Sequence, residues 1–501
     1  MGEYLLGIDV GTSACKAALF DLDGRLVRKA SAEYGVLYRK PGWAEQNPAD
    51  WWAGACSAIR QLFEAPGISP EDVLGIGIDG QSWSAVALGK SGEALTNTPI
   101  WMDGRSEEIC KQLKQKIGER ELFGLCGNPL QPTYTTGKVL WYKENLPLIY
   151  ERTEKILSSN GYLAYRLTGE ICQDISQCYG WHCFDMRAGT WNDEVCREMG
   201  IAPRLLPTIV SCDQVIGHVH QAAAAETGLK VGTPVVAGGL DAACGTLGAG
   251  VFKDGETQEQ GGQAGGMSIC MDAYQAEARL ILSYHVVPGK WLLQGGTTGG
   301  GGVMRWFEKE FAGYERIMEK ETGKSSLNQL NALAETVAPG CDGLVFLPYM
   351  SGERSPIWNP KAKGVFYGLD FSKTKGHMVR ACMEGVAFSL KHNLDVAEAA
   401  GAHVEKLCAV GGSAKSHVWT QIKSDITGKP ISVSGSEEAT AHGAALLAGV
   451  GIGLYRSYEE AVSRTVHEVR RHEPNLENTV RYQEAYESYL LTYEALKSRM
   501  R

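Results

Sequence analysis

An acidic residue followed by small and hydroxyl-bearing residues lies near the start of the chain, in GIDVGTSACK (7–16). Asp9 ends an apolar run there, and its carboxylate can hold a hydrated Mg²⁺, which prefers one or two carboxylates together with phosphates and water. Backbone N–H groups of the following turn can surround phosphate oxygens, and Lys16 can reach a phosphate as a point charge. A plain hairpin capped by Asp9 and Thr12 accounts for the same residues, so this short motif leaves both interpretations open.

A second acid, Asp241, follows an apolar run at the point where a helix is expected to begin, in GGLDAACG (238–245). The helix dipole favours the ionised form of a carboxylate at that place. Phosphoryl transfer to a hydroxyl group needs a carboxylate that orients the hydroxyl and accepts its proton. An N-cap for the helix is the structural alternative, and the two roles are compatible.

Three dense glycine clusters lie in the second half of the chain, at 261–266, 295–302 and 411–416. Because glycine has no Cβ, each cluster lets the backbone approach a ligand closely. A single cluster would be explained by a loop. Three in one half, opposite the Asp9 turn in the other, favour a nucleotide-binding cleft over three unrelated turns.

Aromatic and polar side chains follow two apolar runs of the first half, in GQSW (80–83) and WMDGR (101–105). An aromatic ring can cover the C–H groups of a polyhydroxylated ligand, while amide and charged groups fix its hydroxyls. The two segments therefore indicate a carbohydrate pocket. The alternative is that Trp101 is a core aromatic residue and that Asp103 and Arg105 form a structural pair.

Alternating strand and helix patterns must position these motifs. Short apolar runs that end in glycine turns recur at 4–11, 72–80 and 234–250, and helical patterns lie between them, as at 49–64 and 106–123. Alternating strands and helices are typical of an α/β layered fold.

The second half starts the same pattern again. A hairpin is expected at 256–272, a strand, glycine turn and helix at 406–428, and a helix of small residues suited to close packing at 438–453. We therefore predict two domains, 1–249 and 250–501, related by an ancient duplication.

Composition excludes several classes of protein. The net charge is −9 and no dense Lys/Arg run is present, so nucleic acid and anionic membranes are poor candidate partners. The 14 cysteines form no Cys-x-x-Cys pair, and Cys172, Cys178 and Cys183 fit no common zinc spacing. We expect buried free thiols in a reducing cytoplasm. The sequence has no signal peptide pattern and no apolar run long enough to span a membrane.

The segment FLPYMSGERSP (346–356), followed by Trp358, resembles the F-L-P-Y-x-x-G-E-R-x-P-x-W run of the FGGY family of carbohydrate kinases, within the actin-like ATPase superfamily. The resemblance extends from about Leu5 to about Leu454. It implies an α/β architecture of two actin-like (ribonuclease H-like) domains flanking a deep catalytic cleft. The sugar and the catalytic base would lie on the N-terminal domain and the nucleotide on the C-terminal domain.

Carried over residue by residue, the resemblance implies that Asp241 is the catalytic base and that Asp9 is the acid linked to Mg²⁺. The residues implied to bind ATP are Thr12, Ser13, Lys16, Gly262, Gln263, Gly296, Gly301, Gly411 and Gly412. The residues implied to bind the sugar are Gln81, Ser82, Trp83, Trp101, Asp103, Arg105 and Asp241. The implied reaction transfers the γ-phosphoryl group of ATP to a sugar hydroxyl.

Two positions depart from the family pattern. Ser82 and Trp83 stand where xylulokinases carry Met-His and glycerol kinases carry Arg-Glu, so the pocket for the sugar is altered. The run Gly262-Gln263-Ala264-Gly265 stands where the family usually has G-T-S-G or G-T-G for the γ-phosphate. The longer Gln263 amide can still donate a hydrogen bond to phosphate.

Three functions follow from these motifs. The G-Q pair followed by W-x-D-G-R resembles the xylulokinases and predicts a kinase for a ketopentose such as xylulose. Trp83 leaves open a polyol, hexulose or gluconate-type kinase. Gln263 is the only support for an alternative of another class, an actin-like ATPase or a sugar sensor without kinase turnover. Family members are often dimers, so a homodimer is a further expectation.

Overall fold

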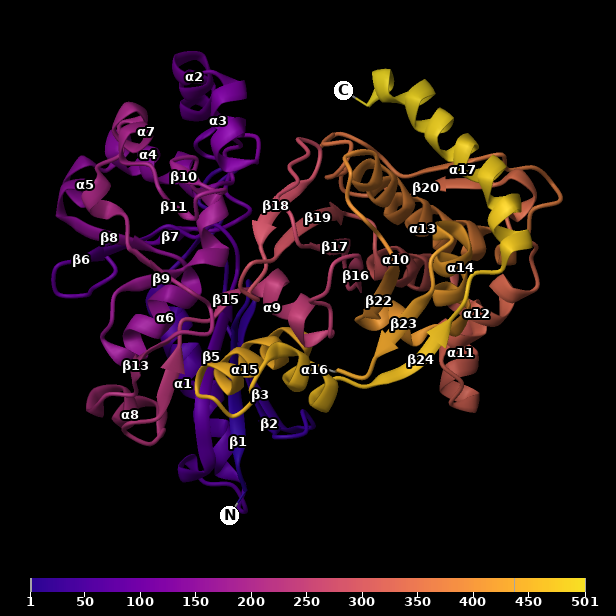
Figure 1. Ribbon diagram of the computed structural model, residues 1–501. Helices are drawn as coiled ribbons and strands as arrows, with labels where there is room; N and C mark the ends of the chain where they lie inside the picture. Colours follow the sequence, from indigo (N-terminus) through magenta and orange to yellow (C-terminus); the bar gives the residue numbers. More distant parts are fainter. Residues whose placement is uncertain (1, 437, 501) are drawn as a thin grey trace.

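The computed structural model describes residues 2–436 and 438–500. Two seven-stranded sheets, each flanked by helices, form the two halves of the molecule (Figure 1). The first sheet has the order β13 (Val215–His218), β14 (Pro234–Val236), β5 (Val73–Gly80), β1 (Tyr4–Val10), β2 (Ala14–Asp21) and β3 (Leu26–Glu33), with β15 (Gly239–Leu240) also paired to β5.

The middle of the first sheet is built from apolar runs. β1 and β5 pair in parallel and are buried along nearly their whole length, as expected of strands covered on both faces. β1 also pairs with β2 in antiparallel register, with Asp9 opposite Lys16. Antiparallel β2 and β3 continue the meander. The Asp9 turn is therefore part of a hairpin, a geometry that both interpretations of this segment share.

Nine helices of the first half are described, and they surround this sheet and the small strand pairs beside it. They are α1 (Pro48–Glu64), α2 (Glu107–Ile117), α3 (Glu119–Cys126), α4 (Thr135–Asn145), α5 (Pro147–Arg152), α6 (Ser159–Thr168), α7 (Asp193–Met199), α8 (Gln221–Thr227) and α9 (Asp241–Gly248). The helical pattern predicted over 106–123 divides into α2 and α3, because Gly118 adopts a φ of 104° that ends the first helix.

The second sheet has the order β18 (Ile281–Tyr284), β19 (Trp291–Thr297), β17 (Gly265–Met271), β16 (Glu256–Gly261), β22 (Lys406–Val410), β23 (Ile431–Ser434) and β24 (Glu468–His472). The helices described in this half are α10 (Gly301–Phe311), α11 (Gly313–Thr322), α12 (Ser326–Glu335), α13 (Lys375–Ala399), α14 (His417–Thr427), α15 (Ala439–Gly451), α16 (Tyr458–Thr465) and α17 (Leu476–Leu496). The hairpin predicted at 256–272 is confirmed as β16 and β17, which pair in antiparallel register. The predicted strand, turn and helix at 406–428 are confirmed as β22, a short 3₁₀ turn (Gly412–Lys415) and α14.

Short strand pairs complete the fold. They are β4 (Glu45–Gln46) with β7 (Thr98–Pro99), β6 (Val86–Gly89) with β8 (Thr153–Leu157), β9 (Cys172–Asp174) with β12 (Thr208–Val210), β10 (Phe184–Asp185) with β11 (Thr190–Trp191), and β20 (Val345–Leu347) with β21 (Val365–Tyr367). All 14 cysteines are free, and all but Cys172 and Cys408 are buried, which confirms the expectation of buried thiols. No helix in the described ranges is long and apolar enough to cross a membrane.

Helix α15 belongs to the second half of the sequence but packs on the first sheet, against β1, β5 and α9 (Figure 1). Its close packing depends on glycine. A Cβ added to Gly77 would lie 1.8 Å from the Ala444 carbonyl oxygen, and one added to Gly443 would lie 1.8 Å from that of Cys244. The predicted close packing of this small-residue helix is confirmed. The domain boundary at 249/250 stays a prediction. Helix α15 follows that boundary in the sequence but covers the first sheet.

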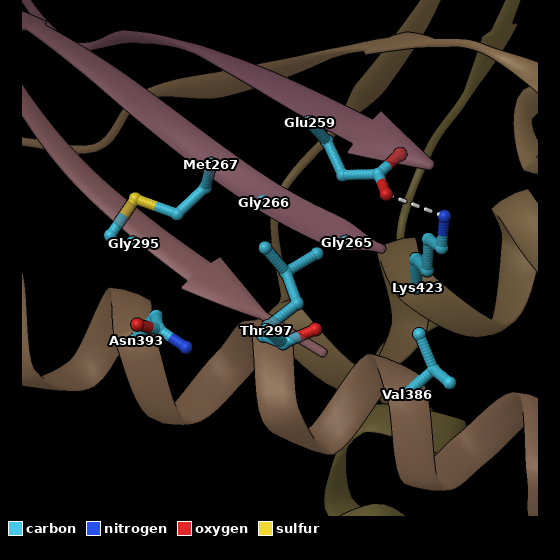
Figure 2. Close-up of a pocket in the computed structure, with 10 residues that line it drawn as sticks. Glu259, Gly265, Gly266, Met267, Gly295, Thr297, Val386, Asn393 and Lys423 are labelled. Atoms are coloured by element: carbon cyan, nitrogen blue, oxygen red, sulfur yellow. Dashed lines mark hydrogen bonds and ion pairs between the residues drawn. The ribbon is translucent and has the colours of Figure 1, made fainter. Parts of the chain in front are cut away.

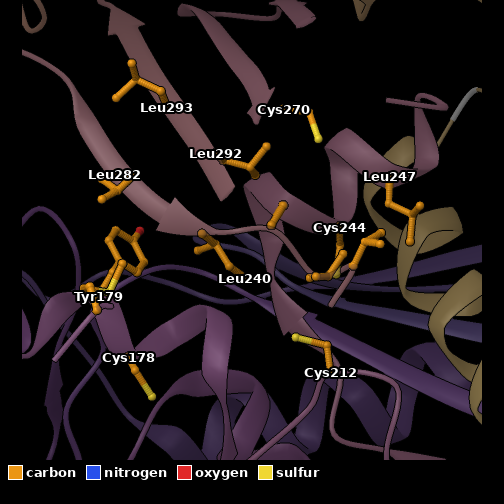
Figure 3. Packing of buried hydrophobic residues seen from close by; sticks show 14 of the residues in the cluster. Cys178, Tyr179, Cys212, Leu240, Cys244, Leu247, Cys270, Leu282, Leu292 and Leu293 are labelled. Atoms are coloured by element: carbon orange, nitrogen blue, oxygen red, sulfur yellow. The ribbon is translucent and has the colours of Figure 1, made fainter. Parts of the chain in front are cut away.

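The hydrophobic core continues from one half into the other around α9. Figure 3 shows Leu240 and Cys244 at the start of this helix, with Leu292 and Leu282 of the second sheet packed near them. All four side chains are fully buried. Burial of this kind holds α9 firmly between the sheets, and Asp241, its first residue, is thereby fixed at the junction.

Candidate active site

The β1–β2 hairpin brings Asp9 and Lys16 together. The two residues are partners across the hairpin, and the Lys16 Nζ lies 3.7 Å from Asp9 Oδ2 and 3.6 Å from a Glu438 carboxylate oxygen. The Asp9 side chain is nearly buried, whereas Lys16 is about half exposed. The lysine can therefore swing toward a ligand in the cleft while Asp9 stays in place.

A second carboxyl group, that of Asp79, lies beside Asp9 because β1 and β5 pair in parallel register at these residues. Asp79 is fully buried, and neither of its carboxylate oxygens accepts a hydrogen bond from a described residue. Burial raises the pKa of Asp79 well above its usual range, and the neighbouring Asp9 carboxyl adds to the shift. Burial likewise raises the pKa of Asp9, opposed by the charge of Lys16. The Asp9 carboxylate, desolvated and placed beside a second acid, fits a divalent cation, whose charge would stabilise its ionised form.

Asp241 begins α9 directly after β15. Its Oδ1 accepts a 2.6 Å hydrogen bond from the Ala242 N–H. Burial raises the pKa of Asp241 to about 7, the charge of Asp9 adds to the shift, and the Ala242 hydrogen bond opposes it. Leu240, and not Asp241, occupies the N-cap position. Asp241 is therefore a helix-terminal carboxyl group whose second oxygen is available to a ligand.

Two adjoining cavities meet at this carboxyl group. The first, of about 360 Å³, is lined among others by Trp83, Trp101 and Tyr179, and the second, of about 420 Å³, by Asp9 and Lys16. The residues that line both cavities are Asp241, Ala242, Gln258, Gln260 and Gly262. We call the first the aromatic cavity and the second the acidic cavity. Asp241 thus faces both ends of one continuous cleft between the two sheets.

A chain of hydrogen bonds fixes the floor of the aromatic cavity. The Trp101 Nε1–H donates to Thr12 Oγ1 at 2.9 Å, and that hydroxyl donates to Gln81 Oε1 at 3.3 Å. The Gln81 amide donates in turn to Gln46 Oε1 at 2.8 Å. Thr12, assigned to the phosphate turn by resemblance, therefore lines the aromatic cavity with Trp101, while Gln81 lies buried behind them.

Trp83 forms one side of the aromatic cavity. Its ring packs edge-on against Tyr134, with centroids 4.3 Å apart, and lies 5.5 Å from Tyr179. Its backbone φ is 56°, an uncommon conformation for a large side chain that must be supported by its surroundings. The neighbouring Ser82 hydroxyl accepts a 2.9 Å hydrogen bond from Tyr179. Both Ser82 and Trp83 line the cavity, and their predicted contact with a sugar stays a prediction.

Asp103 and Arg105 lie outside the cavity lining and are engaged with each other. The Arg105 guanidinium makes two hydrogen bonds, of 2.9 and 2.7 Å, to the Asp103 carboxylate and an ion pair of 2.7 Å to Glu45. It also stacks on Trp43, 3.8 Å from the ring centroid. These contacts favour the structural interpretation of the pair, with Trp101 as the residue of this segment that reaches the cavity.

The glycine clusters divide between the two cavities. Gly262, Gln263 and Gly296 line the aromatic cavity, and Gly262 and Gly411 line the acidic one. Ser13, Gly301 and Gly412, also implied by the resemblance, are not part of the lining. The Gly301 N–H donates to the Gly262 carbonyl at 2.8 Å, and Arg305 donates to the Gln263 side-chain oxygen. The loop that carries Gln263 is therefore held against the start of α10.

A buried ion pair supports the Gly411 loop from behind. Figure 2 shows Lys423 of α14 directed at Glu259 of β16. The Lys423 Nζ lies 2.6 Å from Glu259 Oε1 and also donates to Ser413 Oγ at 2.9 Å. The contact ties the turn after β22 to the strand that carries Gln258 and Gln260. Lys423 positions the glycine turn without reaching the cleft.

Several lining residues had no place in the sequence prediction. Tyr179 and the alternating Gln258 and Gln260 of β16 line the cleft but form no motif. Asp79 does not line either cavity but lies beside Asp9, and the sequence could have indicated it, because its strand ends in an acid just as β1 does. Arg354, which lines the aromatic cavity, lies in the FLPYMSGERSP segment, to which the sequence assigned no chemistry.

Comparison with known proteins identifies the family to which this chain is similar. Family models for the FGGY family of carbohydrate kinases match residues 4–248 with the N-terminal domain and 272–452 with the C-terminal domain. The xylulose kinase of Bacillus subtilis (strain 168) is 30% identical over 497 residues, which is 99% of this chain and 97% of that protein. The gluconokinase of Bacillus licheniformis is 30% identical over 501 residues, with the same coverage of 99% and 97%.

Solved structures match along the whole chain. The xylulose kinase from Rhodospirillum rubrum superposes with a TM-score of 0.89 at 29% identity, over 99% of this chain and 100% of that one. The gluconate kinase from Lactobacillus acidophilus superposes with a TM-score of 0.89 at 25% identity, over 99% and 98% of the two chains. The predicted fold of two actin-like α/β domains is therefore confirmed.

The fold and the cleft together define a two-domain phosphotransferase that uses ATP. The chain belongs to the FGGY family of carbohydrate kinases. It is an ATP-dependent sugar kinase, which decides against the alternative of an actin-like ATPase or sugar sensor without kinase turnover.

Proposed function

We propose that the chain phosphorylates a ketopentose such as xylulose, with Asp241 as the base that accepts the proton of the attacking hydroxyl. The position of Asp241 carries this proposal, because it is the one titratable residue that lines both the aromatic and the acidic cavity among the described residues. Trp83 and Trp101 offer aromatic faces to a sugar on one side. Lys16 offers a positive charge to phosphate on the other.

The reaction follows from this arrangement. The sugar hydroxyl oxygen forms a bond to the γ-phosphorus as the bond from that phosphorus to the β,γ-bridging oxygen breaks, and ADP leaves with the electron pair. The hydroxyl proton passes to the Asp241 carboxylate. Because the transition state is loose, positioning of the two substrates and neutralisation of phosphate charge supply most of the rate enhancement.

We further propose that Asp9 holds Mg²⁺ at the acidic cavity. The nearly buried Asp9 carboxylate, which lines the acidic cavity beside Lys16, supports this assignment. A bound Mg²⁺ would neutralise negative charge that develops on the phosphates. Asp9 would orient the ion, and Lys16 would supply a second positive charge at the same end of the cleft.

Gluconate is the second candidate substrate. Gluconokinases are as similar to this chain as xylulose kinases are, at 30% identity over nearly the full length. Trp83 also lines the aromatic cavity where xylulokinases carry a histidine. Both observations keep a hexonate in view beside the ketopentose.

The test is ADP release measured with a panel of ketopentoses, hexuloses, polyols and gluconate. We expect stimulation by xylulose above the other compounds. Preference for gluconate would replace the ketopentose with the second candidate. Absence of stimulation by every compound would contradict the proposed reaction.

The pH dependence of turnover should follow the ionisation of the Asp241 carboxyl group. Its pKa is raised from 3.8 to about 7, and only the ionised carboxylate accepts a proton. We therefore expect kcat/KM for the sugar to be constant above about pH 7 and to fall about tenfold per pH unit below it. Measurement from about pH 5 to about pH 9 checks this. A profile that stays flat down to the acid end would remove Asp241 as the titrating base.

Substitution of Trp83 should change sugar preference. We expect Trp83→His to raise kcat/KM for D-xylulose relative to gluconate by about tenfold, because one altered pocket contact is worth roughly 1–3 kcal/mol. Trp306→His, on α10 and outside the cavity lining, is the matched control and should leave the ratio unchanged. An equal ratio in Trp83→His and the parent enzyme would show that the Trp83 ring does not contact the sugar.

Location and assembly are also proposals. Fourteen free cysteines are typical of a reducing compartment, which supports a cytoplasmic location. A homodimer is proposed from the family resemblance alone. Light scattering coupled to size exclusion measures the oligomeric state directly, and a monomer at working concentration would contradict the dimer.

A further inference from the structure

Arg354 is a cation of the second domain that reaches the aromatic cavity. It lies in the loop between β20 and β21, and it lines the same cavity as Asp241 and Trp83. Its guanidinium lies against β19, where a Cβ added to Gly296 would be 3.0 Å from the Arg354 Cζ. Glycine at that position is therefore what lets the guanidinium lie flat on the strand beside the cavity.

Within the described part of the chain, the Arg354 guanidinium makes no close ion pair. The one hydrogen bond from its guanidinium to a described residue is a long one, 3.4 Å from Nη2 to the Thr297 carbonyl. Burial lowers the pKa of Arg354, and the charge of Glu353 opposes that shift only in part. The charge of the adjacent Glu353 attracts Arg354, but the Glu353 oxygen accepts the backbone N–H groups of Thr298 and Arg354, at 2.8 and 2.7 Å, and not the guanidinium. Burial also raises the pKa of Glu353 to about 7.

Two other buried arginines show the contrast. Arg105 pairs with Asp103 and Glu45, and Arg380 pairs with Glu384 at 2.7 Å. Removing a charge from water without a partner is costly. A partly buried arginine whose remaining N–H donors are free is therefore a site for an anion that the chain itself does not supply.

The backbone around Arg354 is firmly held. The Gly296 N–H donates to Ser355 Oγ at 2.6 Å, and the Asn393 amide donates to the Ser355 carbonyl at 3.1 Å. Figure 2 shows Asn393 on the helix that runs beneath the end of β19, near Thr297. These contacts fix the base of the side chain, so the guanidinium is positioned before any ligand arrives.

We propose that Arg354 binds the phosphoryl group as it passes from ATP to the sugar, from the aromatic cavity, whereas Lys16 lines the acidic one. The planar guanidinium can hold two phosphate oxygens at once, and phosphoryl transfer places negative charge on oxygens of the moving group. This inference rests on the proposed reaction and adds a catalytic residue from the second domain to it. A carboxylate on the substrate, as in gluconate, is the other anion that could occupy the same donors.

The test compares Arg354→Met and Arg354→Lys with Arg316→Met, an exposed control on α11. Steady-state kinetics are measured with each active sugar, and calorimetry measures binding of ADP, of the sugar and of the phosphorylated product of the parent enzyme. We expect Arg354→Met to lower kcat by about 10²–10³-fold, the effect of losing one transition-state donor. Affinity for the phosphorylated product should fall at least about tenfold, with ADP and sugar affinity retained. Arg354→Lys should recover part of both losses, since charge remains but the fork is lost.

Two results would overturn the inference. One is a kcat within about threefold of the parent enzyme in Arg354→Met, together with unchanged product affinity. The other is a loss confined to gluconate with xylulose turnover intact, which would assign Arg354 to a substrate carboxylate. If the methionine variant does not fold, both measurements are made on Arg354→Lys instead. A parent enzyme inactive on every sugar would instead contradict the proposed reaction.

Discussion

Replacing Asp241 by Asn is expected to lower kcat by about 10²–10⁴-fold, the usual contribution of a positioned general base. Asparagine keeps the shape of the side chain but cannot accept the hydroxyl proton. The Ala242 N–H, which now donates to Asp241 Oδ1, can still bond to the amide oxygen. Nucleotide affinity should therefore be retained, because the change leaves the rest of the acidic cavity intact.

Steady-state turnover and calorimetric binding of ADP measure the two effects separately. Asp272→Asn is the matched control, since this exposed acid pairs with Lys290 at the surface of the second domain. Near-parent turnover in Asp241→Asn would remove Asp241 from the mechanism. Loss of ADP binding together with turnover would point to a general disturbance of the cleft in place of a missing base.

Replacing Asp9 by Asn is the second change with a large expected effect. We expect kcat to fall by roughly a hundredfold or more, because a metal ion contributes several kcal/mol of charge stabilisation in phosphoryl transfer. The distinguishing readout is binding, not activity. The parent enzyme should bind ADP more tightly with Mg²⁺ than with a chelator present, and Asp9→Asn should lose most of that difference.

Asp79→Asn provides the comparison for Asp9. Asp79 lies beside Asp9 in the sheet but does not line the acidic cavity, so its substitution should weaken the Mg²⁺ dependence less. An Asp9→Asn enzyme that keeps the full Mg²⁺-dependent gain in ADP affinity would assign the metal to other residues. Removal of Mg²⁺ by chelation should abolish turnover in every variant.

Patterns within short segments of the sequence were enough to predict the strands and helices that hold the site residues. Asp9 and Lys16 face each other because the hairpin register follows from consecutive residues, and the glycine-rich packing of α15 follows from its run of small residues. The FLPYMSGERSP segment was enough to predict the family. In each case the information lies within a short stretch of chain, where backbone geometry and side-chain type decide the outcome.

Contacts between distant segments were not predictable in the same way. The sequence pattern could not show that Arg105 is already paired with Asp103 and Glu45, or that Thr12 serves the aromatic cavity through Trp101. Nothing near Arg354 in the sequence indicates that its guanidinium makes no close ion pair with any residue that the structure describes. Which polar groups are already satisfied depends on partners brought together from tens or hundreds of residues away.

The sequence by itself determined the two α/β halves, the family, the use of ATP and the identity of Asp241 as the candidate base. Those properties rest on short motifs and on the alternation of apolar and polar residues. The tertiary structure alone decided which side chains line the cleft, because that depends on contacts between segments far apart in the sequence. Packing of α9 between the two halves places Asp241 where the two cavities meet. Asp103 and Arg105 are engaged with each other and with Glu45 outside the cavity lining, whereas the β20–β21 loop brings Arg354 into it.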